Sequence, residues 1–149
     1  MKIALGSDHA GFELKEKIKK FLEQEGHEAL DLGCFSPESV DYPVYGVKVC
    51  QALLAGEAER GILVCGTGLG MSMVANRFPG IRAALCHEPF SARMCRLHND
   101  ANVLVLGGRV IGDVLALEVV KIFLETSFEG GRHARRVNQI DILPREALS

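Results

Sequence analysis

Apolar residues along the chain follow two alternating patterns. Short continuous runs of aliphatic residues, typical of strands buried on both faces of a sheet, cover residues 2–6, 28–32, 61–65, 81–85 and 102–106. Between and after these runs, apolar residues recur at the spacing of one helix face. This spacing predicts helices over residues 12–22, 43–54, 71–77, 89–97 and 113–125, and a last, basic helix over 132–140.

Strands that alternate with helices indicate an α/β fold, in which a five-stranded parallel sheet carries helices on both faces. The chain has 149 residues and no linker or repeat, so we expect one domain over residues 1–149. The pattern leaves the strand order open. Ligands of such sheets bind beyond the carboxyl ends of the strands, so the loops after the first and third strands are the first places to search for a site.

Composition narrows the class of protein. With 48% hydrophobic residues and a net charge of −2, the chain can bury a core and shows no basic surplus for nucleic acid. No apolar stretch approaches the roughly 20 residues of a membrane span, and the N-terminal residues show no signal-peptide pattern. Five cysteines without a C-x-x-C pair favour neither disulfides nor a zinc site. We therefore expect a cytoplasmic protein with no membrane or nucleic-acid partner.

The third predicted strand ends in a glycine-rich loop with Gly66, Gly68 and Gly70. A dinucleotide fingerprint would need glycine where Met71 stands, and the lysine of a phosphate-binding P-loop is missing. Two interpretations remain for this loop. It is either a tight turn between strand and helix, or a cradle of backbone N–H groups for a phosphate or a developing oxyanion.

Cys65 directly precedes this loop. A cysteine at the end of a buried strand more often serves packing than chemistry. Here, however, a helix N-terminus and the loop N–H groups would favour the thiolate, which can act as nucleophile or general base. Asp8 and His9 follow the first strand and would lie at the same sheet edge. Their alternative interpretation is a helix cap beside a solvated imidazole.

Positive side chains gather near the end of the chain. Arg132 and Arg136 are four residues apart and would share one face of a helix, with His133 and Arg135 beside them. Paired guanidinium groups suit a phosphate dianion, although a solvated basic tail would look the same. Arg109, after the fifth strand, is a further anion-binding candidate.

His98 is placed differently from these loop residues. It precedes the fifth strand, so it should lie at the opposite sheet edge from Cys65, about one strand length or 17 Å away. His98 is therefore either structural or part of a site completed by a second subunit. A two-fold dimer would complete two such sites together.

Seven short motifs, in order from residue 6 to residue 133, together resemble type B ribose-5-phosphate isomerases, a family that includes the galactose-6-phosphate isomerase subunits. The motifs are GSDHAG at 6–11, DYP at 41–43, CGTGLG at 65–70, AN at 75–76, GIRA at 80–83, HNDANV at 98–103 and GGRH at 130–133. The resemblance implies a Rossmann-like αβα sandwich that acts on a sugar phosphate without a metal or other cofactor. It also implies a homodimer with shared active sites, in some members paired into tetramers.

The same resemblance assigns roles to residues. Cys65 corresponds to the base that moves a proton between the first two sugar carbons, and His98 to the acid that opens the furanose ring. Some members instead carry a glutamate where Met71 stands here. Substrate contacts are implied at Asp8, His9, Tyr42, Gly66, Thr67, Gly68, Leu69, Gly70, Asn99, Arg109, Arg132 and Arg136.

Three alternatives stay open at this point. The substrate could be a hexose 6-phosphate, such as galactose or allose 6-phosphate, since one carbon of chain length changes binding by only about 1–3 kcal/mol. Cys65 could instead form a covalent intermediate in acyl or phosphoryl transfer. The domain could also bind a phosphosugar without catalysis, although binding alone would require neither Cys65 nor His98.

Overall fold

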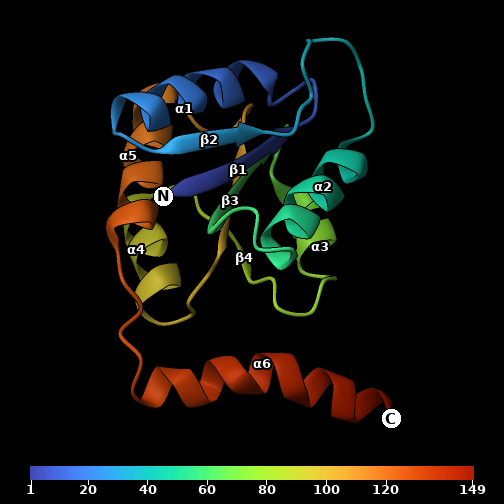
Figure 1. The fold of residues 1–149 in the computed structure, drawn as a ribbon, viewed down its shortest axis with the longest axis vertical. Helices are drawn as coiled ribbons and strands as arrows, with labels where there is room; N and C mark the ends of the chain where they lie inside the picture. Colours follow the sequence, from blue (N-terminus) through green and yellow to red (C-terminus); the bar gives the residue numbers. More distant parts are fainter.

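The computed structural model describes residues 1–149. Five strands and six helices alternate along the chain as the hydrophobic pattern predicts (Figure 1). They are β1 (Lys2–Ser7), α1 (Phe12–Gln24), β2 (Glu28–Asp31), α2 (Tyr42–Leu54), β3 (Arg60–Cys65), α3 (Leu69–Ala75), β4 (Ala83–Leu85), α4 (Pro89–Leu97), β5 (Val103–Gly107), α5 (Asp113–Glu125) and α6 (Arg132–Leu148). None of the helices is both long and apolar enough to cross a membrane.

All strand pairs are parallel, in the order β2-β1-β3-β5-β4. Helices α1, α4 and α5 cover one face of the sheet, and α2 and α3 cover the other (Figure 1). The predicted Rossmann-like sandwich is confirmed, and the strand order, which the pattern left open, now locates its switch point. The chain moves from β1 outward to β2 and then returns to β3 on the other side of β1. The crevice of this sheet therefore opens between the carboxyl ends of β1 and β3, which lie side by side.

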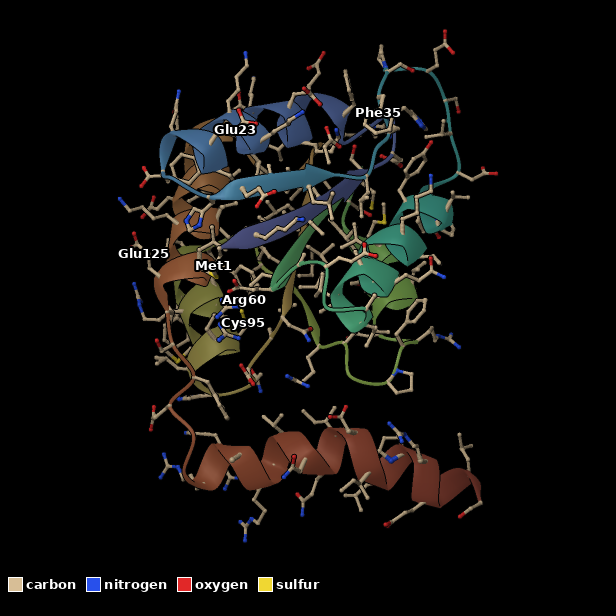
Figure 2. The ribbon with its side chains drawn as sticks, in the orientation of Figure 1. Met1, Glu23, Phe35, Arg60, Cys95 and Glu125 are labelled. Atoms are coloured by element: carbon tan, nitrogen blue, oxygen red, sulfur yellow. The ribbon has the colours of Figure 1, made fainter.

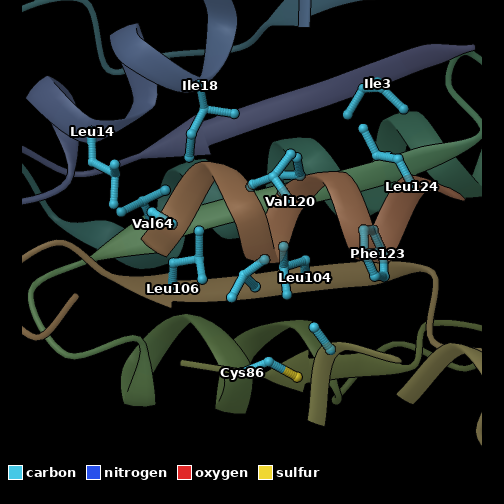
Figure 3. Packing of buried hydrophobic residues seen from close by; sticks show 14 of the residues in the cluster. Ile3, Leu14, Ile18, Val64, Cys86, Leu104, Leu106, Val120, Phe123 and Leu124 are labelled. Atoms are coloured by element: carbon cyan, nitrogen blue, oxygen red, sulfur yellow. The ribbon is translucent and has the colours of Figure 1, made fainter. Parts of the chain in front are cut away.

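Alternation along the central strands sends side chains into two separate cores. Ile62 and Val64 of β3 join the cluster beneath α1 and α5, where Figure 3 shows Val64, whereas Leu63 and Cys65 point toward α2 and α3. All four side chains are buried, which explains why these strands appear in the sequence as unbroken apolar runs. Cys65 therefore ends its strand on the α2 and α3 face.

Most element boundaries lie within two residues of the sequence expectations, and two of the differences have a clear cause. Strand β4 begins at Ala83 rather than 81, because the Arg82 N–H donates to the side chain of Asn102 instead of to a neighbouring strand. Helix α3 ends at Ala75 rather than 77. The side-chain amide of the next residue, Asn76, donates to the Ala83 carbonyl and accepts the Ala83 N–H. The side-chain amides thus replace part of the expected regular structure.

The last helix, α6, is longer than expected. It continues past 140 to Leu148 and contains Pro144, whose missing N–H removes one helical hydrogen bond. In Figure 1 this helix lies along the bottom of the molecule, apart from the two layers around the sheet. An ion pair between Arg82 and Asp141, with N and O atoms 3.6 Å apart, links it to the body.

A lysine is fully buried beside the sheet. Lys15 of α1 is 0% exposed, and its Nζ donates to both carboxylate oxygens of Asp31 at 2.8 Å. The rings of Phe12 and Phe35 lie 5.4 and 5.5 Å from the same nitrogen, and Phe35 is labelled in Figure 2 in the loop after β2. Asp31 also accepts the N–H of Gly33. This ion pair fixes the start of the loop that leads to α2.

Replacing Lys15 by alanine should leave the carboxylate of Asp31 buried without its main partner. We expect the free energy of unfolding to fall by about 3 kcal/mol, as is typical when one member of a buried pair is removed. Lys20→Ala, at an exposed position of the same helix, should change it by less than about 0.5 kcal/mol. Urea unfolding measures both. Equal stability of the two variants would contradict a stabilising role for the buried pair.

Candidate active site

The loop after β3 brings one backbone amide to the Cys65 sulfur. The N–H of Gly68 donates to Cys65 Sγ at 3.2 Å. Gly68 has φ +81°, and a Cβ there would lie 2.4 Å from the Leu85 side chain, so only glycine fits. Thr67 Oγ1 accepts the N–H of Leu69, which begins α3. The cysteine thus lies beside an amide donor, although its side chain is only 4% exposed and also contacts the apolar cluster under α2 and α3.

The loop after β1 runs directly alongside. Asp8 is 7% exposed, and its Oδ1 accepts the N–H groups of Ala10 and Gly11 at 3.0 Å. Asp8 therefore caps the turn that precedes α1. It does not cap the helix itself, whose N-cap residue is Gly11. His9 is not simply solvated, because its Nδ1 accepts the N–H of Val40 at 3.1 Å. This contact attaches the loop after β2 to the same edge of the sheet.

Two further predicted residues border the glycine loop. The Arg109 N–H donates to the Gly66 carbonyl at 3.0 Å, and a Cβ built on Gly66 would lie 3.5 Å from the Arg109 guanidinium. A Cβ built on Gly70 would lie 2.4 Å from the ring of Tyr42, at the start of α2. The carboxyl edge therefore brings together ten of the predicted site residues: Asp8, His9, Tyr42, Cys65, Gly66, Thr67, Gly68, Leu69, Gly70 and Arg109.

His87 also lies at this edge and was missed by the sequence analysis. Its Nε2 accepts the N–H of Gly107 at 2.9 Å, so the neutral ring carries its proton on Nδ1. Burial lowers the pKa of His87, which favours this neutral form. The signal was present in the sequence, because His87 follows β4 much as Cys65 ends β3 and Asp8 follows β1.

The other predicted residues form a separate group at the opposite edge. His98 ends α4 and stacks on His133 of α6, with ring centroids 4.2 Å apart. His133 is 5% exposed; its burial lowers its pKa, and the nearby positive groups His98, Arg132 and Arg136 lower it further against the opposing effect of Glu129. Arg132 and Arg136 are one turn apart on α6, as the spacing predicted.

The one cavity of the chain lies at this second edge. It has a volume of about 470 Å³ and separates α6 from the amino ends of β4 and β5. Asn99 is the only predicted site residue in its lining, which consists of Asn76, Phe78, Pro79, Ile81, Arg82, Ala83, Ala84, Cys95, Asn99, Ala101, Ile140, Asp141 and Pro144. Cys65 does not border it. Within one chain, the cysteine edge therefore has amide and guanidinium donors but no enclosed pocket.

The five cysteines are all free and buried, yet their environments differ. Burial raises the pKa of Cys50 to about 11, so its thiol stays protonated at neutral pH. The interaction between the Cys86 and Cys95 thiols raises the pKa of Cys86, which burial raises further, and lowers the pKa of Cys95. Among these thiols, Cys65 has the backbone amide donor of the glycine loop.

The chain is similar to known proteins of one family. A family model described as Ribose/Galactose Isomerase matches residues 3–140. The chain is 50% identical over 139 residues to ribose-5-phosphate isomerase B of Escherichia coli, covering 93% of each chain. Ribose 5-phosphate isomerase of Thermotoga maritima superposes with a TM-score of 0.92 at 60% identity, covering 94% of this chain and 97% of that one. Ribose-5-phosphate isomerase B of Clostridium thermocellum superposes with a TM-score of 0.96 at 52% identity, covering 99% of each. The chain therefore belongs to the ribose/galactose isomerase family.

Proposed function

We propose that this protein is an aldose–ketose isomerase that interconverts ribose 5-phosphate and ribulose 5-phosphate. The observation that carries the proposal is the Gly68 N–H donated to Cys65 Sγ, at a sheet edge where Asp8 and Arg109 also lie. The relatives with the same fold and about half of the same residues are named for this activity. No nucleotide or metal is needed for such a proton transfer.

Cys65 is the base in this proposal. Its thiolate removes the proton from C2 of the open-chain aldose, and the C–H electron pair forms the C1–C2 double bond of an enediolate. The electron pair of the C1 carbonyl moves onto O1, and the C2 hydroxyl passes its proton to O1. The thiol then returns the carbon-bound proton to C1, where the pair of the C1–C2 double bond forms the new C–H bond and the pair on O2 forms the ketose carbonyl. A positioned base contributes about 10²–10⁴-fold, and one oxyanion donor, such as an N–H of residues 66–70, on the order of 10²–10³-fold.

The remaining roles require the second group of residues. His98 protonates the ring oxygen and opens the furanose, Asn99 contacts the sugar, and Arg132 and Arg136 bind the phosphate beside Arg109. His98 and Cys65 stand at opposite ends of the sheet, about 17 Å apart by the length of a five-residue strand. One small sugar phosphate cannot reach both within a single chain. The edge with His98 therefore comes from a second copy of the chain.

Helix α6 supports this homodimer. Ile140, Ile142, Leu143 and Leu148 leave half or more of their surface exposed, on a helix that lies apart from the body (Figure 1). Apolar side chains gathered on the exposed surface of one helix typically mark a protein interface. A two-fold pair would place α6 and His98 of each chain near the glycine loop of the other and complete two sites. Two such dimers could associate further into a tetramer.

Removal of the thiol should abolish most of the catalysis. We expect Cys65→Ala to fold and to lose at least about 10²-fold in turnover, since the base is gone. Cys50→Ala is the matched control, because it deletes another buried thiol of the same apolar cluster. Steady-state kinetics with ribose 5-phosphate measures both variants. Full turnover by Cys65→Ala would remove this residue from the mechanism.

A substrate panel tests the activity itself. With a chelator present, we expect ribose 5-phosphate to be converted faster than galactose 6-phosphate or allose 6-phosphate. The rate of ketose formation measures the conversion of each sugar. A preference for either hexose would identify the alternative isomerase. Binding without turnover of any of the three would indicate a phosphosugar sensor. A covalent adduct on Cys65, seen by mass spectrometry, would indicate group transfer in place of isomerisation.

Subunit exchange tests the shared site. Cys65→Ala and His98→Asn homodimers should each be nearly inactive. After mixing under conditions that exchange subunits, half of the sites in a mixed dimer carry both intact residues, so activity should return to at most about one quarter of the wild-type value for random pairing. Fluorescently labelled chains verify the exchange. Verified exchange with no recovery would mean that the two residues do not serve one site across an interface.

A further inference from the structure

A second chemical feature lies at the edge with His98. His98, Glu129 and His133 come from the end of α4, the linker before α6 and the first turn of α6, and their potential ligand atoms all lie within 4.8 Å of one another. The Glu129 N–H donates to the Leu97 carbonyl, which holds the linker against the end of α4. We propose that these three residues form a binding site for a zinc ion, which inhibits the enzyme by occupying His98.

The environment of His133 is the strongest observation. Its Nε2 is buried and has no hydrogen-bond partner, an arrangement that costs free energy for a polar atom. Glu129 Oε1 lies 3.7 Å from this nitrogen, beyond hydrogen-bond distance. A ligand between these two atoms would satisfy both.

The spacing suits a metal better than a hydrogen bond. Tetrahedral zinc with bonds of about 2.0–2.2 Å places its ligand atoms about 3.3–3.5 Å apart, close to the observed 3.7 Å between His133 Nε2 and Glu129 Oε1. The Glu129 side chain is 54% exposed and can move the remaining few tenths of an ångström. Two imidazoles and one carboxylate leave the fourth position to water, as in open zinc sites.

His98 must adjust more than Glu129. Its ring is stacked on that of His133 with 13° between the planes, so the nitrogen lone pairs of the two rings run side by side rather than toward one point. Rotation of the partly exposed His98 ring about its Cβ–Cγ bond would turn one nitrogen toward the shared ion. That torsion has a broad energy minimum, and His133, which is buried, can remain in place.

The surrounding charge determines which cation fits. Arg132 and Arg136 are close enough to affect the electrostatics of His133, and they oppose any dication. Magnesium and calcium bind mainly through charge and prefer several oxygen ligands, so one carboxylate among guanidinium groups would not hold them. Imidazole nitrogen is a good ligand for zinc, and it makes zinc the cation of choice here.

Zinc at this site would use the lone pair that His98 needs for proton transfer. The inhibitory part of the inference therefore rests on the proposed function, in which His98 opens the sugar ring. The binding part does not, because it concerns only the three ligands. Calorimetry and kinetics consequently test the two parts separately.

Titration calorimetry with zinc chloride tests the binding. Wild-type protein should bind one ion per chain saturably and should not bind magnesium. Glu129→Gln should bind zinc at least about 10-fold more weakly, since loss of even an outer-shell partner commonly costs that much. Glu125→Gln is the matched control, because Glu125 is an exposed glutamate four residues earlier, at the end of α5 (Figure 2). This control variant should bind zinc as tightly as the wild type does. No saturable zinc binding, or equal affinity in Glu129→Gln, would overturn the site.

Zinc inhibition of ribose 5-phosphate isomerisation tests the consequence. We expect zinc to inhibit the wild type, a chelator to restore it, and Glu129→Gln to keep its basal activity while requiring at least about 10-fold more zinc. Inhibition at the same zinc concentration in wild type and Glu129→Gln would place the effect at a thiol such as Cys65, and would overturn the inhibitory role. If no variant turns over a sugar phosphate, the proposed function fails, and calorimetry alone still decides the metal site.

Discussion

The parallel pairing of β1 with β3 is the constraint on which the rest of the site depends. Ser7 pairs with Val64 in this ladder, so the chain leaves both strands at the same edge, with Asp8 and Cys65 as the next residues along the two strands. The two loops then approach so closely that a Cβ on Gly11 would lie 2.4 Å from the Val64 carbonyl oxygen. Register in a sheet buried on both faces is strongly specified. The core therefore determines how far the Asp8 carboxylate, the Cys65 thiol and the N–H groups of the glycine loop lie from one another.

The motifs that identify the family combine two kinds of residue. Cys65 and Gly68 shape the carboxyl edge, whereas the amides of Asn76 and Asn102 replace missing strand and turn hydrogen bonds around β4. Asn102 accepts the Arg82 N–H and donates to the Gly80 carbonyl, a pairing that no aliphatic residue could supply. These motifs thus contain both the residues of the carboxyl edge and the amides that shape the strand β4.

Sequence reasoning worked where a pattern is local. Continuous apolar runs located all five strands, and the chain direction alone predicted that Cys65 and Asp8 share an edge while His98 does not. It could not give the strand order or the stack of His98 on His133, because both depend on contacts between distant segments. Helix α6 was predicted too short, since its last turns lie beyond the basic segment and contain a proline. His87 was overlooked although it follows β4, because the sequence analysis searched for a site first in the loops after the first and third strands.

The opposite placement of the two groups has a structural cause and a functional consequence. In a parallel sheet every strand carries its two ends to opposite edges, so a residue before β5 and a residue after β3 cannot approach each other by any local change. The separation of His98 from Cys65 is therefore as rigid as the sheet itself. The proposed reaction uses both groups and so requires two chains. Helix α6 contacts the body through the His98 stack and the Arg82 ion pair and leaves apolar side chains exposed. In the proposed dimer this helix carries both the proposed phosphate ligands Arg132 and Arg136 and the apolar side chains of the interface, so substrate affinity and subunit association should respond together to changes in α6.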